Sequence, residues 1–112
     1  CVIVVATDAP LDSRQLTRLA TRAVFGMART GSDYRHGSGD YGIAFSVGEG
    51  APVIGRAIDP LFHAVQEAVE EAILNSLFMA ETTRGVDGHV RFAVPTEYVV
   101  DELRRRGVIA DE

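Results

Sequence analysis

The sequence predicts a single unit of the α+β class, without an internal domain boundary in residues 1–112. Two short runs predict strands: residues 2–7 are rich in the β-branched residues typical of buried strands, and residues 41–47 place Ile43 and Phe45 on one face. Two longer runs repeat apolar residues at the spacing of amphipathic helices. No interdomain linker or internal repeat separates them, and 112 residues suffice to bury a core within one domain or subunit.

The first strand and helix are expected between residues 2 and 31. Residues 2–7 form a short, continuous run of mostly valine and isoleucine, which predicts a strand buried on both faces. Asp12 and Gln15 have the spacing of a capping box, with Asp12 as the N-cap. Gly31 is expected at the C′ position that ends the helix. The apolar stripe consists of Leu16, Leu19, Ala20, Ala23, Val24, Met27 and Ala28.

The middle of the chain predicts a loop and a second strand. Residues 30–40 are polar and rich in glycine, and loops on rigid scaffolds often carry function. A strand is expected over residues 41–47, with Ile43 and Phe45 on the same face. Val53 and Ile54 are expected to begin a short third strand.

A long amphipathic helix is expected from Asp59-Pro60 to about residue 80, with Asp59 as its N-cap and Pro60 at its first position. Its apolar surface covers more than half of its circumference, which indicates a covering layer. Residues 84–94 predict an irregular crossing broken by glycines. A last helix is expected from Pro95-Thr96 to Gly107, where three consecutive arginines occupy the final turn and favour the helix dipole.

Composition argues against several classes of function. The net charge of -5 argues against nucleic-acid binding, and no apolar run is long enough to cross a membrane. His36, His63 and His89 lie far apart without metal-binding spacing, and Gly37-Ser38-Gly39 lacks the pattern of a phosphate loop. We therefore expect a protein without metal or cofactor, located in the cytoplasm and without nucleic-acid or membrane partners.

Cys1 is the residue that most clearly indicates a chemical reaction. It is the single cysteine, and a thiol and a free α-amine on one residue provide a nucleophile with its own base. We therefore expect a chain produced by cleavage before Cys1. Three alternatives remain: an arbitrary fragment boundary, a lipidated first residue, and a packing cysteine. The apolar strand that follows at once disfavours a lipid tether, which would need a flexible leash.

Ser38 and Asp40 are the candidate partners of Cys1. A model α-amine titrates near pH 7.7 and a model thiol near 8.5, so the two groups of Cys1 can exchange a proton near neutral pH. Ser38 is expected to position the amine or relay its proton, and Asp40 to hold Ser38 and stabilise the ammonium. From these residues alone the assignment is a sketch, because a Ser-Gly-Asp sequence is usually only a turn.

Several segments occur in an order and at a spacing that are more specific together than singly. They are the run from Val2 to Leu11, Gln15-Leu16, Arg18-Leu19-Ala20, the run from Gly26 to Gly31, Gly37-Ser38-Gly39-Asp40, Ala44-Phe45-Ser46, the run from Ala72 to Thr82, and Asp87-Gly88-His89. On these segments, which span almost the whole chain, the sequence resembles the small β subunit of the L-aminopeptidase/D-esterase and β-aminopeptidase family.

This resemblance implies a four-layer αββα sandwich like that of ornithine acetyltransferase-like proteins, completed by a separate α subunit. It implies an autoprocessed N-terminal nucleophile hydrolase, in which Cys1 is the nucleophile and Ser38 and Asp40 are the supporting serine and acid. The partners implied are the α subunit of the same precursor, which would supply oxyanion donors, a small-molecule amide substrate, and further αβ heterodimers in an oligomer.

Cys1 departs from the family pattern, which has serine at this position, or threonine in the pantetheine hydrolase and nylon-oligomer hydrolase branches. The cysteine is either a natural variant or an engineered replacement. The pantetheine hydrolase of carbapenem biosynthesis begins with threonine, for which cysteine is a sensible experimental replacement. We therefore favour a pantetheine-type amide as substrate, with release of cysteamine. The alternatives are a β- or D-aminopeptidase or D-esterase, an acyltransferase of the ornithine acetyltransferase type, and a non-catalytic assembly subunit.

Overall fold

The computed structural model describes residues 1–110, which fall into two compact units. The first unit covers Cys1–Ile73, and the second begins at Leu74, within the last turns of a long helix. The elements in chain order are β1 (Val2–Thr7), α1 (Ser13–Ala28), β2 (Tyr41–Ser46), the 3-10 turn η1 (Gly55–Ile58), α2 (Asp59–Phe78), β3 (Thr83–Arg84), the 3-10 turn η2 (Val86–Gly88), β4 (Val90–Arg91) and α3 (Thr96–Arg105).

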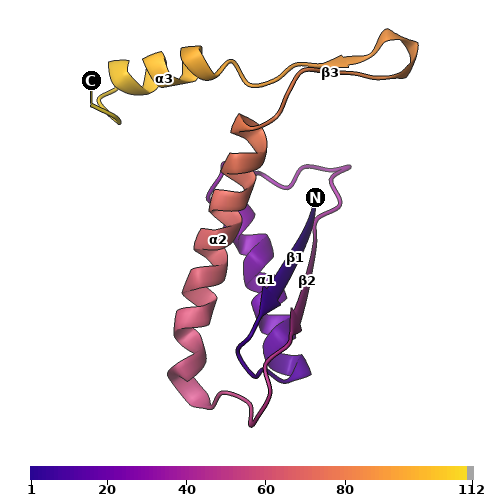
Figure 1. Ribbon diagram of the computed structural model, residues 1–112, viewed down its shortest axis with the longest axis vertical. Helices are drawn as coiled ribbons and strands as arrows, with labels where there is room; N and C mark the ends of the chain where they lie inside the picture. The colour runs from indigo at the N-terminus through magenta and orange to yellow at the C-terminus, as the bar shows by residue number, and fades with distance from the viewer. Residues whose placement is uncertain (111–112) are drawn as a thin grey trace. The chain divides into compact units, whose positions relative to one another are not determined.

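The first unit is built on a parallel pair of strands. β1 pairs with β2 in a register that runs from Val2 opposite Tyr41 to Thr7 opposite Ser46. Parallel neighbours need a long crossover connection, and α1 provides it here. Figure 1 shows the two strands side by side, with α1 and α2 running along them. β1 has the predicted bounds, and β2 is one residue shorter than predicted.

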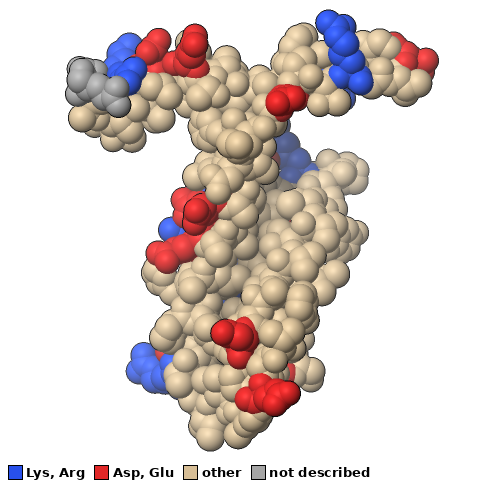
Figure 2. All heavy atoms as spheres, in the orientation of Figure 1, with Lys and Arg blue, Asp and Glu red and all other residues tan. Residues whose placement is uncertain are grey.

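One face of this sheet is covered by the helices and the other is exposed, so the prediction that β1 is buried on both faces is wrong for this chain. Side chains alternate between the two faces along each strand. Ile3, Val5 and Ala44 pack against the core. The large side chains of the opposite face are Val2, Val4, Tyr41, Ile43 and Phe45, which are exposed by 64%, 62%, 64%, 57% and 46%. We call these five residues the open sheet face, and the surface over the strands carries few charged side chains in Figure 2.

The core of the first unit lies between α1, η1, α2 and the covered face of the sheet. Its buried members are Leu19, Ala23, Met27, Ile58, Phe62, Val65 and Val69. Two glycines permit the close packing of these layers. A Cβ on Gly26 would lie 3.0 Å from the Val69 side chain, and a Cβ on Gly42 would lie 2.5 Å from the Ala20 carbonyl oxygen. β2 therefore approaches the backbone of α1 more closely than any side chain would allow.

Replacing Gly42 by alanine is expected to lower the free energy of unfolding by about 1–3 kcal/mol, because the added methyl group must displace a helix backbone. Gly85→Ala is the matched control, since a Cβ there meets its nearest atom at an ordinary 3.7 Å. Chemical denaturation of both variants measures the difference. Equal stability of the two variants would contradict this account of the contact between α1 and β2.

The predicted capping box of α1 is confirmed. Asp12 Oδ1 accepts a hydrogen bond from the Gln15 backbone at 2.8 Å, and Gln15 Oε1 accepts one from the Asp12 backbone at 3.0 Å. The helix ends at Ala28, and Gly31, at φ +87°, follows two residues after the C-cap Arg29. A tightened final turn, in which Thr30 donates to Met27, moves the left-handed glycine one position beyond the predicted C′.

Two predictions around the start of α2 are wrong. Residues 53–54 form no strand, although the Val53 backbone donates to the Pro10 carbonyl at 3.1 Å. Asp59 is the first helical residue, with φ -58° and ψ -40°, and not an N-cap in extended conformation. The preceding turn η1 already has helical geometry, so the chain enters α2 without the extended residue that an N-cap requires. The helix ends at Phe78, two residues before the predicted position.

The second unit contains a short hairpin and α3. The expected irregular crossing is instead an antiparallel pair, in which Thr83 faces Arg91 and Arg84 faces Val90. The hairpin turn contains two residues with positive φ, Asp87 and Gly88. α3 ends at Arg105, and Gly107 is confirmed as the stop, because the Val108 and Gly107 backbones donate to the carbonyls of Leu103 and Arg104 in a Schellman motif. No helix in residues 1–110 is both long enough and apolar enough to cross a bilayer.

Candidate active site

Parallel strand pairing brings Cys1 next to Asp40. The Tyr41 backbone donates to the Cys1 carbonyl at 2.9 Å, which extends the register one step beyond the pair of Val2 and Tyr41. Cys1 and Asp40 therefore lie side by side at the amino ends of β1 and β2. The two residues are 39 positions apart in the sequence, and only the strand register places them together.

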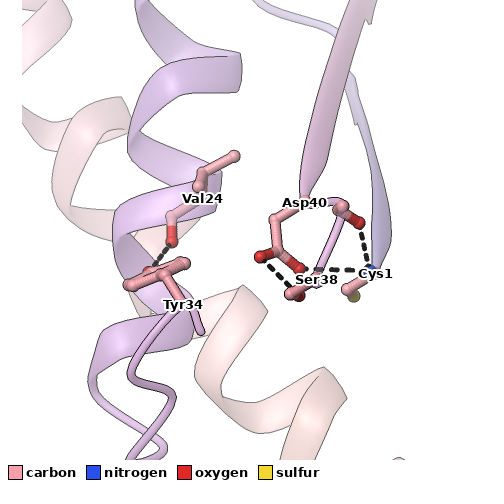
Figure 3. Close-up of polar contacts among 6 residues, drawn as sticks. Cys1, Val24, Tyr34, Ser38 and Asp40 are labelled. Atoms are coloured by element: carbon pink, nitrogen blue, oxygen red, sulfur yellow. Dashed lines mark hydrogen bonds and ion pairs between the residues drawn. The ribbon is translucent and has the colours of Figure 1, made fainter. Parts of the chain in front are cut away.

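The α-amine of Cys1 is held by two acceptors from the loop before β2. It donates to the Gly39 carbonyl at 2.7 Å and to Asp40 Oδ1 at 3.1 Å. The Ser38 hydroxyl donates to the other carboxylate oxygen, Oδ2, at 2.8 Å. Figure 3 shows Cys1, Ser38 and Asp40 drawn together by these contacts. The structure thus gathers all three predicted site residues, with Asp40 bonded to both of the others.

The electrostatics of the site follow from these contacts. The side chain of Asp40 is 10% exposed, whereas that of Cys1 is 40% exposed and accessible from solvent. The hydrogen bond from Ser38, followed by that from the α-amine, lowers the pKa of Asp40 below its ordinary value of 3.8. Asp40 is therefore a carboxylate at neutral pH, where it stabilises a positive charge on the α-amine.

A tight turn delivers Ser38 to this carboxylate. The Ser38 backbone donates to the Arg35 carbonyl at 3.0 Å, and Gly37 within the turn has φ +92°, a conformation that favours glycine. Earlier in the loop, Tyr34 has φ +50° and its hydroxyl donates to the Val24 carbonyl of α1 at 2.5 Å (Figure 3). The loop is therefore held to α1 at one end and to Cys1 at the other.

Two further groups take part in holding the loop before β2, and the sequence does not indicate them as site residues. The Gly39 carbonyl is a backbone acceptor, and no residue type signals it. Tyr34 belongs to the predicted polar loop of residues 30–40, where an aromatic residue among glycines and small polar residues is the one signal of a specific contact. The three histidines do not join the site: all are exposed, and His63 pairs with Glu67 at 3.3 Å. Residues 1–110 contain no cluster of three or more potential metal ligands.

The sequence matches the model of peptidase family S58 over residues 1–91. The chain belongs to this family. Two β-peptidyl aminopeptidases named BapA are among its relatives. The enzyme of Sphingosinicella xenopeptidilytica is 33% identical over 94% of this chain and 29% of its own length. That of Sphingosinicella microcystinivorans is 41% identical over 84% of this chain and 27% of its own length.

Solved structures of similar fold agree with this membership. The PH0078 protein of Pyrococcus horikoshii OT3 is 47% identical, with a TM-score of 0.87 over 95% of this chain and 33% of its own. The L-aminopeptidase D-Ala-esterase/amidase of Ochrobactrum anthropi, described as a new variant of the Ntn hydrolase fold, is 32% identical, with a TM-score of 0.88 over 97% of this chain and 34% of its own. The β-aminopeptidase of a Burkholderia species is 36% identical, with a TM-score of 0.78 over 93% of this chain and 35% of its own.

These likenesses confirm the predicted α+β class and the predicted family. The S58 chain described here spans about a third of the length of each of these structures and slightly less of the curated relatives.

Proposed function

We propose that this S58 chain carries the nucleophile of an amide hydrolase and that Cys1, freed by self-cleavage, is that nucleophile. The observation that carries the proposal is the α-amine of Cys1 bonded to an Asp40 carboxylate that also accepts from Ser38. Family membership supports the same chemistry, since relatives of this chain are named as aminopeptidases and an amidase. No metal or cofactor has a role in the proposal.

The proposed reaction uses both groups of Cys1. The thiol gives its proton to the neutral α-amine, and the sulfur attacks the carbonyl carbon of the substrate amide. A C–S bond forms, the C–N bond breaks, and the ammonium returns the proton to the departing amine. Water then attacks the thioester while the α-amine takes one of its protons. The C–S bond breaks, and the carboxylic acid and the thiol are released.

Asp40 and Ser38 support this cycle. Asp40 stabilises the ammonium each time the amine accepts a proton. Two of the N–H groups of the amine donate hydrogen bonds, to Gly39 and to Asp40, and these fix the direction of the third position on nitrogen, which exchanges the proton. Ser38 orients the carboxylate through its second oxygen. We assign the donors that stabilise the oxyanion to the part of the protein outside these 112 residues.

We further propose that the missing length is an α subunit of the same precursor and that it covers the open sheet face. The five large apolar side chains of this face form the kind of exposed patch that marks an interaction surface, and a second sheet packing face to face would bury it. The relatives are about three times as long as this chain, which is enough for a second sheet with its own helices. Such packing gives the four-layer sandwich and αβ units that assemble into oligomers.

For the substrate, we propose an amide with a free amino group, as in β-peptides, because the named relatives are aminopeptidases. The pantetheine amide favoured by the threonine branch of the family has no support among these relatives. It remains a prediction and enters the experiment as a second probe.

The experiment is expression of the full-length precursor, followed by intact-mass analysis and assay with a β-alanyl amide and with pantetheine. We expect two copurifying pieces, the smaller beginning at Cys1, an acyl adduct on Cys1, and release of the amine from the β-alanyl amide. A precursor that stays uncleaved and releases amine from neither probe would overturn the proposal. Release from pantetheine alone would restore the pantetheine hydrolase assignment.

A further inference from the structure

We infer that Tyr34 is a positioning residue. Its hydroxyl, hydrogen-bonded to α1, fixes the turn that allows the Ser38 hydroxyl to donate to Asp40. The inference rests on the proposed function, since it gives Tyr34 a part in that same site. It adds a residue that lies outside the trio of Cys1, Ser38 and Asp40 and that acts through Ser38.

The conformation of Tyr34 is the first observation. Its φ of +50° is a left-handed conformation that costs an aromatic residue free energy, and such conformations persist where the surrounding contacts hold them. The side chain is 41% exposed, so burial of the ring alone does not hold it. The hydrogen bond of 2.5 Å from its hydroxyl to the Val24 carbonyl is the contact that offsets the strain. Figure 3 shows this tyrosine against α1 at Val24.

The path from Tyr34 to the carboxylate is short and continuous. Arg35, the next residue, supplies the carbonyl that accepts from the Ser38 backbone at 3.0 Å. The Ser38 hydroxyl then donates to Asp40 at 2.8 Å. Because the turn spans only four residues, a displacement of Arg35 moves Ser38 directly. Loss of the Tyr34 hydrogen bond therefore weakens the bond from Ser38 to Asp40.

Few charged groups surround Asp40, so an effect of Tyr34 on its titration can be measured. The Cys1 amine is the ionisable group recorded in contact with the carboxylate within residues 1–110. Asp33 and Arg35, in the same loop, pair with each other and are both largely exposed. Neither α1 nor α2 contributes a recorded charged contact to Asp40 in the described part of the chain. A change in the titration of Asp40 thus reports on Ser38 and the amine.

The test uses Tyr34→Phe, which removes only the hydroxyl, in the cleaved full-length protein. The pKa of Asp40, read from carboxyl carbon NMR, is expected to rise toward its ordinary value, because its strongest lowering contact comes from Ser38. We expect kcat to fall about tenfold, as for loss of one hydrogen bond, with KM within about twofold. The acid limb of the rate profile should move to higher pH. Tyr98→Phe, an exposed tyrosine of α3, is the matched control and should change neither quantity.

A second variant separates the hydrogen bond from the strain. Tyr34→Asn accepts the left-handed conformation more readily than tyrosine and also lacks the hydrogen bond. The same rise in the Asp40 pKa in both variants supports positioning through the hydroxyl. An unchanged Asp40 titration in Tyr34→Phe, or activity lowered equally at every pH, would overturn the inference. Failure of the proposed function has a different signature, since the wild-type protein would then form no acyl adduct while its Asp40 titration could still be measured.

Discussion

Cys1→Ala is expected to leave the precursor uncleaved and to lower amide hydrolysis by about 10⁴-fold or more, as removal of a catalytic nucleophile does. Alanine has no atom that can form the acyl intermediate, and the same atom is proposed to cleave the bond before residue 1. The loss of cleavage would appear as a single band of full precursor mass. The loss of hydrolysis would appear as the absence of released amine from a β-alanyl amide.

Cys1→Ser is the matched control for this variant. A hydroxyl can replace the thiol in the same cycle, so self-cleavage and hydrolysis are both expected to persist in Cys1→Ser. A thiol-specific alkylating reagent should inactivate the wild-type enzyme and spare Cys1→Ser, because the side chain of Cys1 is exposed and Cys1→Ser has no thiol at the proposed site. Wild-type hydrolysis in Cys1→Ala would remove Cys1 from the mechanism and leave the chain an assembly role.

Asp40→Asn is expected to lower kcat by about 10²–10³-fold, comparable to the loss of one charge-stabilising group in a preorganised site. The amide keeps the size of the carboxylate but loses the charge that stabilises the ammonium. It also offers one oxygen where the structure uses two, one for the amine and one for Ser38. Steady-state kinetics on the cleaved enzyme measures the loss, and mass analysis shows whether cleavage also slows.

Asp33→Asn is the matched control, because Asp33 lies in the same loop but is 60% exposed and pairs only with Arg35 among its recorded contacts. It should change kcat by less than about twofold, as expected for a solvent-exposed ion pair. Equal losses in the two variants would mean that any charge change in this loop is harmful and would contradict a specific role for Asp40.

The pH dependence of Asp40 follows from the direction of its pKa shift. The folded-state pKa lies below the ordinary value of 3.8, so folding favours the carboxylate. The resulting stabilisation is present above the unfolded-state pKa and is lost as the pH falls through the lower folded-state pKa. Activity that needs the carboxylate should therefore persist to more acidic pH than an unperturbed aspartate would allow.

The local features of the fold could be predicted because they depend on neighbouring residues. The capping box of Asp12 and Gln15 and the stop at Gly107 use contacts within a few positions of the chain. The same holds for β1, whose bounds follow from its valine-rich run. The N-cap role predicted for Asp59 is wrong because the turn η1 before it already has helical geometry.

The prediction that β1 is buried on both faces failed because burial depends on distant parts of the protein. The run of valine and isoleucine in β1 indicates burial on both faces, yet one face is open in this chain. The small residues Gly42 and Ala44 face the helices, whereas the large residues Ile43 and Phe45 face outward. This arrangement supports the proposal that a second layer from another part of the protein covers the open sheet face.

The sequence by itself determined the first two strands, the three helices, the family, and the chemical types at residues 1, 38 and 40. It did so because helix caps, strand composition and short motifs are local properties of the chain. Only the tertiary structure decided that the Cys1 amine meets Gly39 and Asp40, and that Tyr34 reaches Val24. These contacts depend on the register of two parallel strands and on the packing of a loop against a helix, and no local pattern specifies either of them.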